Sequence, residues 1–323
     1  MHTSIKHHGW LKSMDEISRS RITLLILIGL SYAIVLPLVS FSGMRSDHAV
    51  QLPLTAVTAM TAATAACVCT RKGLDLLRSG LEIYVCGFLF ILPEGLAVYC
   101  AVYLKMPWAD AQLSAMDAAL GWNWYTLISI VDSKPVLARL LAVAYASFAL
   151  QLSILPLLLV LAGRTARAYQ MVTCSAVMIF IGAAISIWYP AVGTHTHYGY
   201  DLGNLKNLDP KAAIQFMGEL TAVHDNPNFV FSLARATGIQ TFPSMHAAIA
   251  VLCGWAAWDV KAIRYPFFVL NIFMGFSAMV VSNHYLVDVI AGVGVAGLSI
   301  SVILMLVRRP YDHRHQRLRA LAL

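Results

Sequence analysis

Two short segments near the C-terminus contain residue types that can perform acid–base or nucleophilic chemistry. The first is Pro243-Ser244-Met245-His246, and the second is His284-Tyr285-Leu286-Val287-Asp288. Each opens a long apolar stretch, so each is expected where a hydrophobic helix meets water. Histidine and aspartate are costly at such a boundary, and they commonly mark a functional site.

The second segment places a histidine and a carboxylate four residues apart. On a helix this spacing puts His284 and Asp288 on one face. A hydrogen bond between them would fix the tautomer of the imidazole and leave its other nitrogen free to attack phosphorus. A purely structural pair that caps the last helix has the same spacing. The presence of His246 at another helix start favours the catalytic interpretation.

The first segment predicts a helix start that can bind an anion. Ser244 after Pro243 is expected to be the N-cap, which places His246 in the first turn. Free N–H groups and the positive end of the helix dipole favour a phosphate there. We expect Ser244 to contact that phosphate and His246 to lie beside its leaving oxygen. An ordinary helix start with an interfacial histidine would have the same sequence.

A metal site is a third interpretation of these residues. His246, His284 and Asp288 together with water have the ligand types of a catalytic zinc site. The predicted anion site and the absence of further carboxylates favour chemistry without a metal. We therefore expect no cofactor, and an activity that chelators do not affect.

The whole composition is that of a membrane protein. Hydrophobic residues make up 59% of the 323 residues, charged residues make up 12%, and the mean hydropathy is +0.69. Runs near the 20 apolar residues needed to cross hydrocarbon recur along the chain. We count eight of them, the sixth being short: residues 22–42, 52–70, 81–104, 136–161, 168–189, 245–258, 267–283 and 287–307. The expected fold is an all-α integral membrane protein.

The distribution of basic residues predicts an orientation. With the N-terminus in the cytoplasm, inner segments hold 16 of the 23 lysines and arginines and outer segments hold 7. Both termini would then be cytoplasmic, and His246 and His284 would face outward, from what we expect to be a bacterial inner membrane. The net charge of +7 lies mostly in loops next to the membrane, so we expect contacts with anionic lipid headgroups and no nucleic-acid partner.

We divide the chain into three parts. Residues 1–78 form an N-terminal segment with two additional helices, residues 79–307 form a six-helix catalytic core, and residues 308–323 form a basic cytoplasmic tail. Two outer loops interrupt the core at 105–135 and 190–242. Tryptophans in the first loop predict a helix in the membrane interface, with a gate over the substrate as the alternative.

Both segments resemble motifs of the type 2 phosphatidic acid phosphatase superfamily. Phe242-Pro243-Ser244-Met245-His246-Ala247-Ala248 is similar to its second motif, and the stretch from Asn283 to Gly292 is similar to its third. The resemblance covers about residues 81–307. It implies that His284 forms a phosphohistidine, that Asp288 orients it, and that His246 protonates the leaving alkoxide and then activates the acceptor.

The departures from the family pattern concern positive charge. No segment before Ser244 matches the first motif, and Ser277 and Ala278 stand where the third motif usually has Ser-Arg. A phosphomonoester dianion needs more nearby cations than a diester monoanion. The pattern around His284, together with Tyr189-Pro190-Ala191-Val192-Gly193, is closest to inositol phosphorylceramide synthases and sphingomyelin synthases. This branch implies a transferase.

Replacement groups for phosphate binding are expected in the second outer loop. Arg235 is the first candidate because it precedes the sixth apolar run and carries a guanidinium suited to phosphate. Further candidates are His195, His197, Tyr198, Lys206 and Lys211, although ordinary solvated loop residues would look the same. Glu94 is an acid inside an apolar run, where it would line a lipid cavity or pair with a polar neighbour.

These observations predict a membrane lipid phosphoesterase that transfers a phosphoryl group or phospho-headgroup from a lipid to an alcohol. The first alternative is a lipid phosphate phosphatase that uses water. The second is a transporter or channel in which the same histidines relay protons, but such a pathway would scatter acids through the midplane, where only Glu94 lies. An inactive scaffold is disfavoured because all three catalytic candidates are present.

Overall fold

The computed structural model of the chain describes residues 15–307, except for the side chains of residues 48–50. The apolar helices are α2 (Glu16–Ser42), α3 (His48–Arg71), α4 (Asp75–Tyr103), α7 (Pro135–Leu161), α8 (Thr165–Ser186), α11 (Met245–Ala257), α12 (Arg264–Val281) and α13 (Leu286–Val307). In the described range, seven are long and apolar enough to cross a membrane, whereas α11 has only 13 residues. The all-α membrane fold is confirmed, and the short sixth segment does not reach spanning length.

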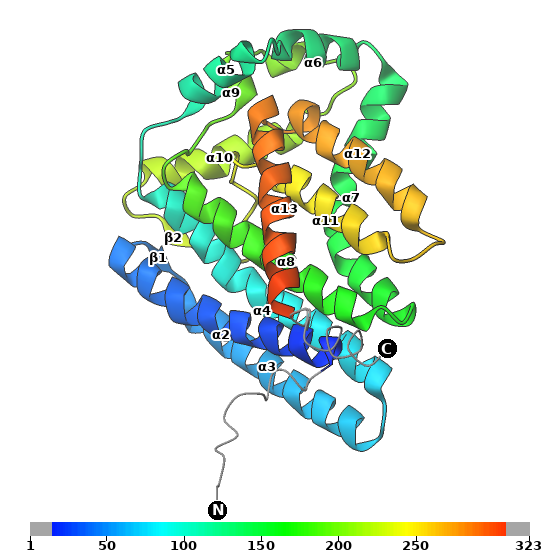
Figure 1. The fold of residues 1–323 in the computed structure, drawn as a ribbon. Coiled ribbons are helices and arrows are strands. Elements are labelled where there is room, and N and C mark those ends of the chain that lie inside the picture. The colour runs from blue at the N-terminus through cyan, green and yellow to red at the C-terminus, as the bar shows by residue number, and fades with distance from the viewer. Residues whose placement is uncertain (1–14, 308–323) are drawn as a thin grey trace, which may run out of the picture.

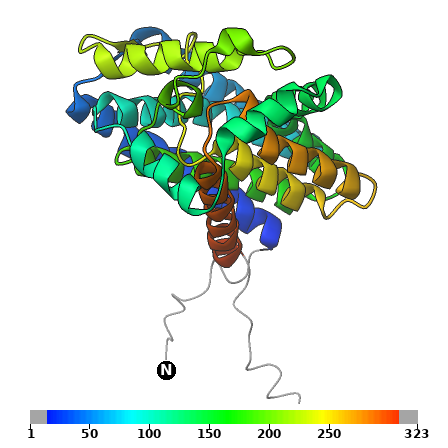
Figure 2. The ribbon, with the colours of Figure 1, turned by 90° about the horizontal axis from the view of Figure 1, so that it is seen from above.

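Smaller elements occupy the connections between these helices (Figure 1). They are α5 (Asp110–Ala119), α6 (Trp124–Asp132), α9 (Thr194–His197), the 3₁₀ helix η1 (Leu202–Asn204), α10 (Lys211–Asp225), β1 (Arg45–Ser46) and β2 (Val230–Phe231). The two strands form a short parallel pair in which Arg45 lies opposite Val230. The α5, α6 and α10 helices lie across the top of the bundle (Figure 2).

Local sequence signals set several helix ends. The side chain of Asp15 accepts a hydrogen bond of 2.7 Å from the N–H of Ser18 and caps α2. Gly43 ends the same helix at a φ of 76°, a left-handed conformation that glycine adopts without steric cost. Pro135 begins α7, where its missing N–H has no helical partner to lose.

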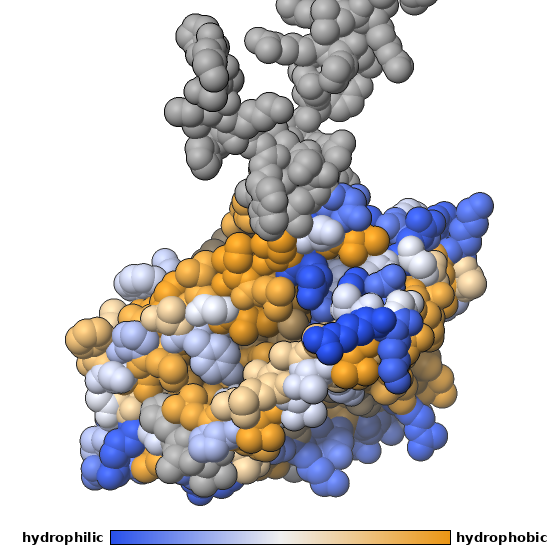
Figure 3. All heavy atoms as spheres, turned by 90° about the horizontal axis from the view of Figure 1, so that it is seen from below, coloured by the Kyte–Doolittle hydropathy of each residue, from blue (hydrophilic) through white to orange (hydrophobic). Residues whose placement is uncertain are grey.

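The α8 helix lies inside the bundle and α3 lies at its margin. The most apolar stretch of α8 is 56% buried, whereas that of α3 is 11% buried. Hydrophobic side chains cover much of the lower face of the molecule, with hydrophilic ones gathered toward its edges (Figure 3). Such an apolar exterior is expected where lipid, and not water, surrounds the helices.

The start of α2 and the end of α13 lie at the same end of the bundle. Arg19 Nε donates a hydrogen bond of 2.6 Å to the carbonyl oxygen of Val307. The α5, α6 and α9 helices lie at the opposite end (Figure 1). The basic residues expected at 6, 12 and 308–319 lie outside the described residues.

The α2 helix supports α4 at a proline. Pro93 lacks an N–H, so the carbonyl of Leu89 one turn earlier loses its helical partner. The hydroxyl of Tyr32 donates to this carbonyl at 2.8 Å. The additional N-terminal helices therefore complete the hydrogen bonding of a core helix.

We expect Tyr32→Phe to lower the free energy of unfolding by about 1 kcal/mol, because it leaves a partly buried carbonyl without a donor. Unfolding of the purified protein in detergent would measure this change. Tyr84→Phe is the matched control, because Tyr84 lies on α4 with 56% of its surface exposed. Equal stability of the two variants would contradict the role given to Tyr32.

Candidate active site

His284 and Asp288 form a buried hydrogen-bonded pair at the start of α13. His284 Nδ1 lies 3.2 Å from Asp288 Oδ2, and the exposed fractions of these residues are 4% and 0%. A carboxylate only accepts hydrogen bonds, so Nδ1 carries the proton and the other ring nitrogen keeps its lone pair. The same Asp288 oxygen accepts the backbone N–H of Tyr285 at 3.0 Å, which fixes the carboxylate against the turn.

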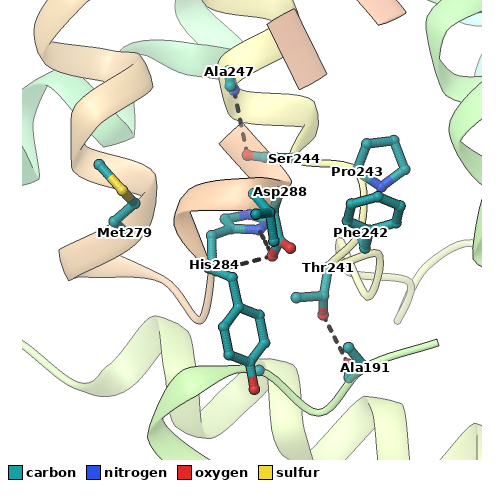
Figure 4. A network of polar contacts seen from close by, with 12 residues as sticks. Ala191, Thr241, Phe242, Pro243, Ser244, Ala247, Met279, His284 and Asp288 are labelled. Carbon is teal, nitrogen blue, oxygen red and sulfur yellow. Dashed lines mark hydrogen bonds and ion pairs between the residues drawn. The ribbon is translucent and has the colours of Figure 1, made fainter. Parts of the chain in front are cut away.

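The start of α11 packs directly against this pair (Figure 4). Ser244 is the N-cap of α11, and its hydroxyl accepts the N–H of Ala247 at 3.4 Å. The N–H of Ser244 donates to the backbone carbonyl of Asp288 at 3.0 Å. This close approach requires Gly292, because a Cβ at that position would collide with the carbonyl oxygen of Ser244. Two segments distant in the sequence are thus joined backbone to backbone.

His246 faces His284 across a short gap. Their ring centroids are 6.4 Å apart with an interplanar angle of 59°. The imidazole of His246 stacks on Tyr145 at 4.0 Å and lies 4.5 Å from the ring of Phe148. No described residue hydrogen-bonds to the His246 ring, so its nitrogens are available to a ligand.

Both histidines open into a cavity of about 840 Å³. Its wall comes from α4, α7, α8, α10, α11 and the loops that precede α11 and α13. Most of the wall is apolar, and the polar groups near the histidines include Gln240, Thr241 and Asn283. A cavity of this size with a few convergent polar groups is typical of a small-molecule or lipid site.

Asp110 on α5 forms hydrogen bonds with two loops that lie next to His284 and Asp288. Its carboxylate accepts the backbone N–H groups of Val192 and Gly193 at 2.9 and 2.8 Å, and the hydroxyl of Tyr285 at 2.9 Å. Burial and the neighbouring Asp110 raise the pKa of Tyr285, so its hydroxyl stays protonated and donates. Gly193 approaches Asn283 so closely, at a φ of 87°, that no Cβ fits there.

Asp117, two turns further along α5, holds the first turn of α13. Its two carboxylate oxygens accept the N–H groups of Leu286 and Val287, each at 2.9 Å. These are free N–H groups of a helix start, which a carboxylate stabilises through charge as well as hydrogen bonding. The loop at 105–135 therefore positions α13, the helix that carries Asp288.

The family pattern of the PAP2 superfamily matches residues 111–302. The chain belongs to the PAP2 superfamily. Membership gives it the character of a phosphatase-type lipid phosphoesterase with an all-α membrane fold. Searches of curated proteins and of solved structures returned no match.

The structure of this PAP2 superfamily member brings together four of the ten residues predicted for the site. Ser244, His246, His284 and Asp288 meet at the junction of α11 and α13. Their catalytic and phosphate-binding roles remain predictions. His246, His284 and Asp288 do not form a metal-ligand cluster, and the described residues contain no group of three such side chains arranged for one.

The other six predicted residues, Lys206 and Lys211 among them, lie outside the described wall of the cavity. Arg235 is exposed, and His197 is exposed with Nε2 3.1 Å from the hydroxyl of Ser114. Tyr198 stacks on Trp124 at 5.6 Å. His195 is buried against Trp124, and burial lowers its pKa to about 4, so it is neutral at pH 7. The geometry therefore gives none of these side chains a place beside the histidines.

No lysine or arginine occurs among the described residues that line the cavity. Asn283, which the sequence analysis used only as part of a motif, has both side-chain polar atoms buried without a partner in the described part of the chain. The Oε1 atom of Gln240 is likewise buried without a hydrogen-bond partner in the described part of the chain. Asn283 thus has an amide N–H group available beside the histidines, whereas the Nε2 of Gln240 already donates to the carbonyl of Pro243 at 3.1 Å.

The loop at 105–135 packs against the helical bundle, which differs from the predicted helix lying in the membrane interface. Trp124, one of the tryptophans on which that prediction rested, is 2% exposed and donates to the carbonyl of Met279 at 3.0 Å. Asp110 and Asp117 of the same loop are both buried. The loop docks on the catalytic core because its aspartates bind backbone N–H groups of the site.

We expect Asp117→Asn to lower kcat about tenfold to a hundredfold, with a smaller change in KM. An asparagine oxygen can accept one N–H, but its amide nitrogen would face the other, and supporting residues of this kind cost about that much when lost. Steady-state turnover of a lipid phosphate would measure it. The control is Asp132→Asn, which loses similar bonds to the N–H groups of Lys206, Asn207 and Leu208 away from the site. An equal loss of kcat in both variants would contradict a specific positioning role.

Proposed function

We propose that this protein transfers a phospho-headgroup or phosphoryl group from a membrane lipid to an alcohol through a phosphohistidine on His284. The observation that carries the proposal is the buried His284–Asp288 pair, which faces His246 across 6.4 Å at the wall of a large apolar cavity. A two-step displacement requires a nucleophile that a carboxylate holds in place. It also requires a second group, on the opposite side, that can give and take a proton.

The proposed reaction proceeds in two balanced steps. The unprotonated nitrogen of His284 attacks phosphorus, the bond from phosphorus to the leaving alcohol oxygen breaks, and His246 gives that oxygen a proton. An acceptor hydroxyl then loses its proton to His246 and attacks phosphorus, and the bond to His284 breaks. Positioning and electrostatic stabilisation supply most of the rate in such transfers.

The lack of basic side chains in the described lining of the cavity supports a phosphodiester donor over a phosphomonoester donor. The described lining has amides and hydroxyls near the histidines but no lysine or arginine. A monoester dianion would be poorly stabilised there, whereas a diester monoanion needs less positive charge. Hydrolysis of a lipid phosphate with water as acceptor is the second candidate, and it uses the same residues.

Products decide between the two candidates. The purified protein would be incubated with mixed lipid phosphomonoesters and phosphodiesters, with and without a polyol, and the products would be identified by mass spectrometry. A transferase gives a new phosphodiester that appears only with the alcohol. Free phosphate or a free phospho-headgroup in equal amounts under both conditions would instead establish a hydrolase.

We also propose that the site opens to the extracytoplasmic side of a bacterial inner membrane. The distribution of basic residues supports this side, because inner loops carry the excess. Labelling of a cysteine introduced beside His197 in intact cells, with a reagent that does not cross the membrane, would test it. Labelling only after the membrane is opened would place the site in the cytoplasm.

A further inference from the structure

A second cavity continues from the active-site cavity into the bundle. It has a volume of about 350 Å³, and its wall comes from apolar residues of α4, α7 and α8. The two cavities share lining residues, which are Phe88, Ile91, Glu94, Phe148, Ala149 and Ile179. The two cavities therefore adjoin along these residues, and we call the narrower one the slot.

The slot has the shape and chemistry expected for a hydrocarbon chain. It extends along α4 from Glu94 to Ile83, a distance of roughly 16 Å at the rise of an α-helix. Tyr84 and Ile91 of its wall are 56% and 45% exposed, so this side of the bundle is open toward the surrounding lipid. A lipid whose phosphate lies at His284 can then place its chain in the slot, with Glu94 between them.

Glu94 differs from the other acid in the apolar part of α4. Glu82 is fully paired: its oxygens accept bonds of 2.6 and 2.8 Å from Arg21 and one of 2.8 Å from the hydroxyl of Tyr169. No described residue pairs with the carboxylate of Glu94. Glu94 is also the single acidic side chain among the described residues that line either cavity.

An acid without a protein partner inside a membrane bundle is costly unless a ligand supplies one. We propose that Glu94 accepts a hydrogen bond from a hydroxyl or amide N–H at the junction between the phosphate end and the hydrocarbon chain of the lipid donor. This inference rests on the proposed function. Glu94 thereby selects lipids with a donor group at that junction over lipids whose junction carries only ester or ether oxygens.

The selection follows from the chemistry of the two lipid classes. A lipid hydroxyl or amide N–H donates to the glutamate carbonyl oxygen, whereas an ester or ether oxygen has no hydrogen to donate and leaves that oxygen unpaired, whether or not the acid carries a proton. Sites built to hydrogen-bond a substrate group discriminate strongly against analogues that lack it. No other acidic group in the described lining could replace this contact.

The test compares two lipids that differ only in the proposed donor. Monoacylglycerol phosphate and its phosphoglycerol ester would each be prepared with a free sn-2 hydroxyl and with an sn-2 methyl ether. We expect the full-length wild-type protein to favour the hydroxyl form by about tenfold in kcat/KM. Glu94→Leu should bring this ratio close to one, and Glu94→Gln, which keeps an acceptor oxygen, should retain most of it.

Glu82→Gln is the matched control, because it makes the same change on the same helix away from both cavities. It should lower stability and leave the substrate ratio at the wild-type value. Dissociation constants for the same lipids, measured by calorimetry on His284→Ala protein, separate this inference from the proposed reaction. Absence of all turnover would end the proposed function, while the binding ratio would still test Glu94.

The assignment would be overturned if the wild-type protein bound the hydroxyl and methyl ether lipids equally well. An unchanged binding ratio in Glu94→Leu protein that elutes as a single folded species would overturn it too. A dependence on Glu94 that appears only with a monoacyl phosphoethanolamine would also overturn it, because the partner would then be a headgroup ammonium.

Discussion

Replacement of His284 by alanine is expected to reduce turnover of any lipid phosphate by at least about 10⁴-fold, because it removes the nucleophile of the proposed reaction. The exposed fraction of His284 is 4%, and its ring is held by one carboxylate at the mouth of the cavity. Among the described residues no second histidine can take its place, because His246 lies on the far side of the gap with its ring stacked on Tyr145. Product release from purified protein would measure the loss.

A suitable control is His224→Ala on α10. His224 also pairs with an aspartate, since its Nδ1 lies 2.8 Å from Asp225, but it stacks on Trp108 and does not line the cavity in the described part of the chain. We expect this variant to keep most of the activity. Normal turnover in folded His284→Ala protein would remove the mechanism altogether.

Asp288→Asn is expected to have the second largest effect, a loss of about 10²- to 10³-fold in kcat. The asparagine amide can donate to His284 Nδ1, which moves the ring proton to the other nitrogen and removes the lone pair that attacks phosphorus. Its single oxygen would also have to replace the contact that Asp288 makes with the N–H of Tyr285. The change keeps the volume of the side chain, so the fold should survive.

The pair on α10 again provides a control. Asp225→Asn changes an equivalent histidine–aspartate contact in which the aspartate side chain is 71% exposed, and it should leave kcat near the wild-type value. Circular dichroism in detergent would establish that both variants are folded. Activity of Asp288→Asn within a factor of two of wild type would show that the carboxylate does not set the tautomer.

The helices and the centre of the site could be predicted from the sequence because local rules determine them. Apolar runs near 20 residues mark α2, α4, α7 and α13, and spacing by four places His284 beside Asp288. The Pro-Ser signal correctly placed the N-cap of α11 at Ser244. Each of these features depends on residues within one turn or one helix.

The supporting parts of the site could not be predicted in this way. Asp110 and Asp117 act on backbone groups more than 80 residues away, and carboxylates that bind N–H groups have no spacing to recognise. The position of Arg235 along the chain predicts a phosphate contact, but the loop between β2 and α11 leaves its side chain exposed. The partner of Glu82 is Arg21, on a helix that the sequence marks only as an addition to the core.

The most direct test of the central claim is to trap the covalent intermediate. The wild-type protein would be mixed with a lipid phosphate, quenched within one turnover under alkaline conditions that preserve phosphohistidine, and digested for peptide mass spectrometry. The account predicts one phosphorylated histidine, His284, which is lost in His284→Ala protein and forms more slowly when His246 is replaced by alanine. Efficient turnover with no phosphorylation of His284 at any time point, or a phosphate on a different residue, would contradict it.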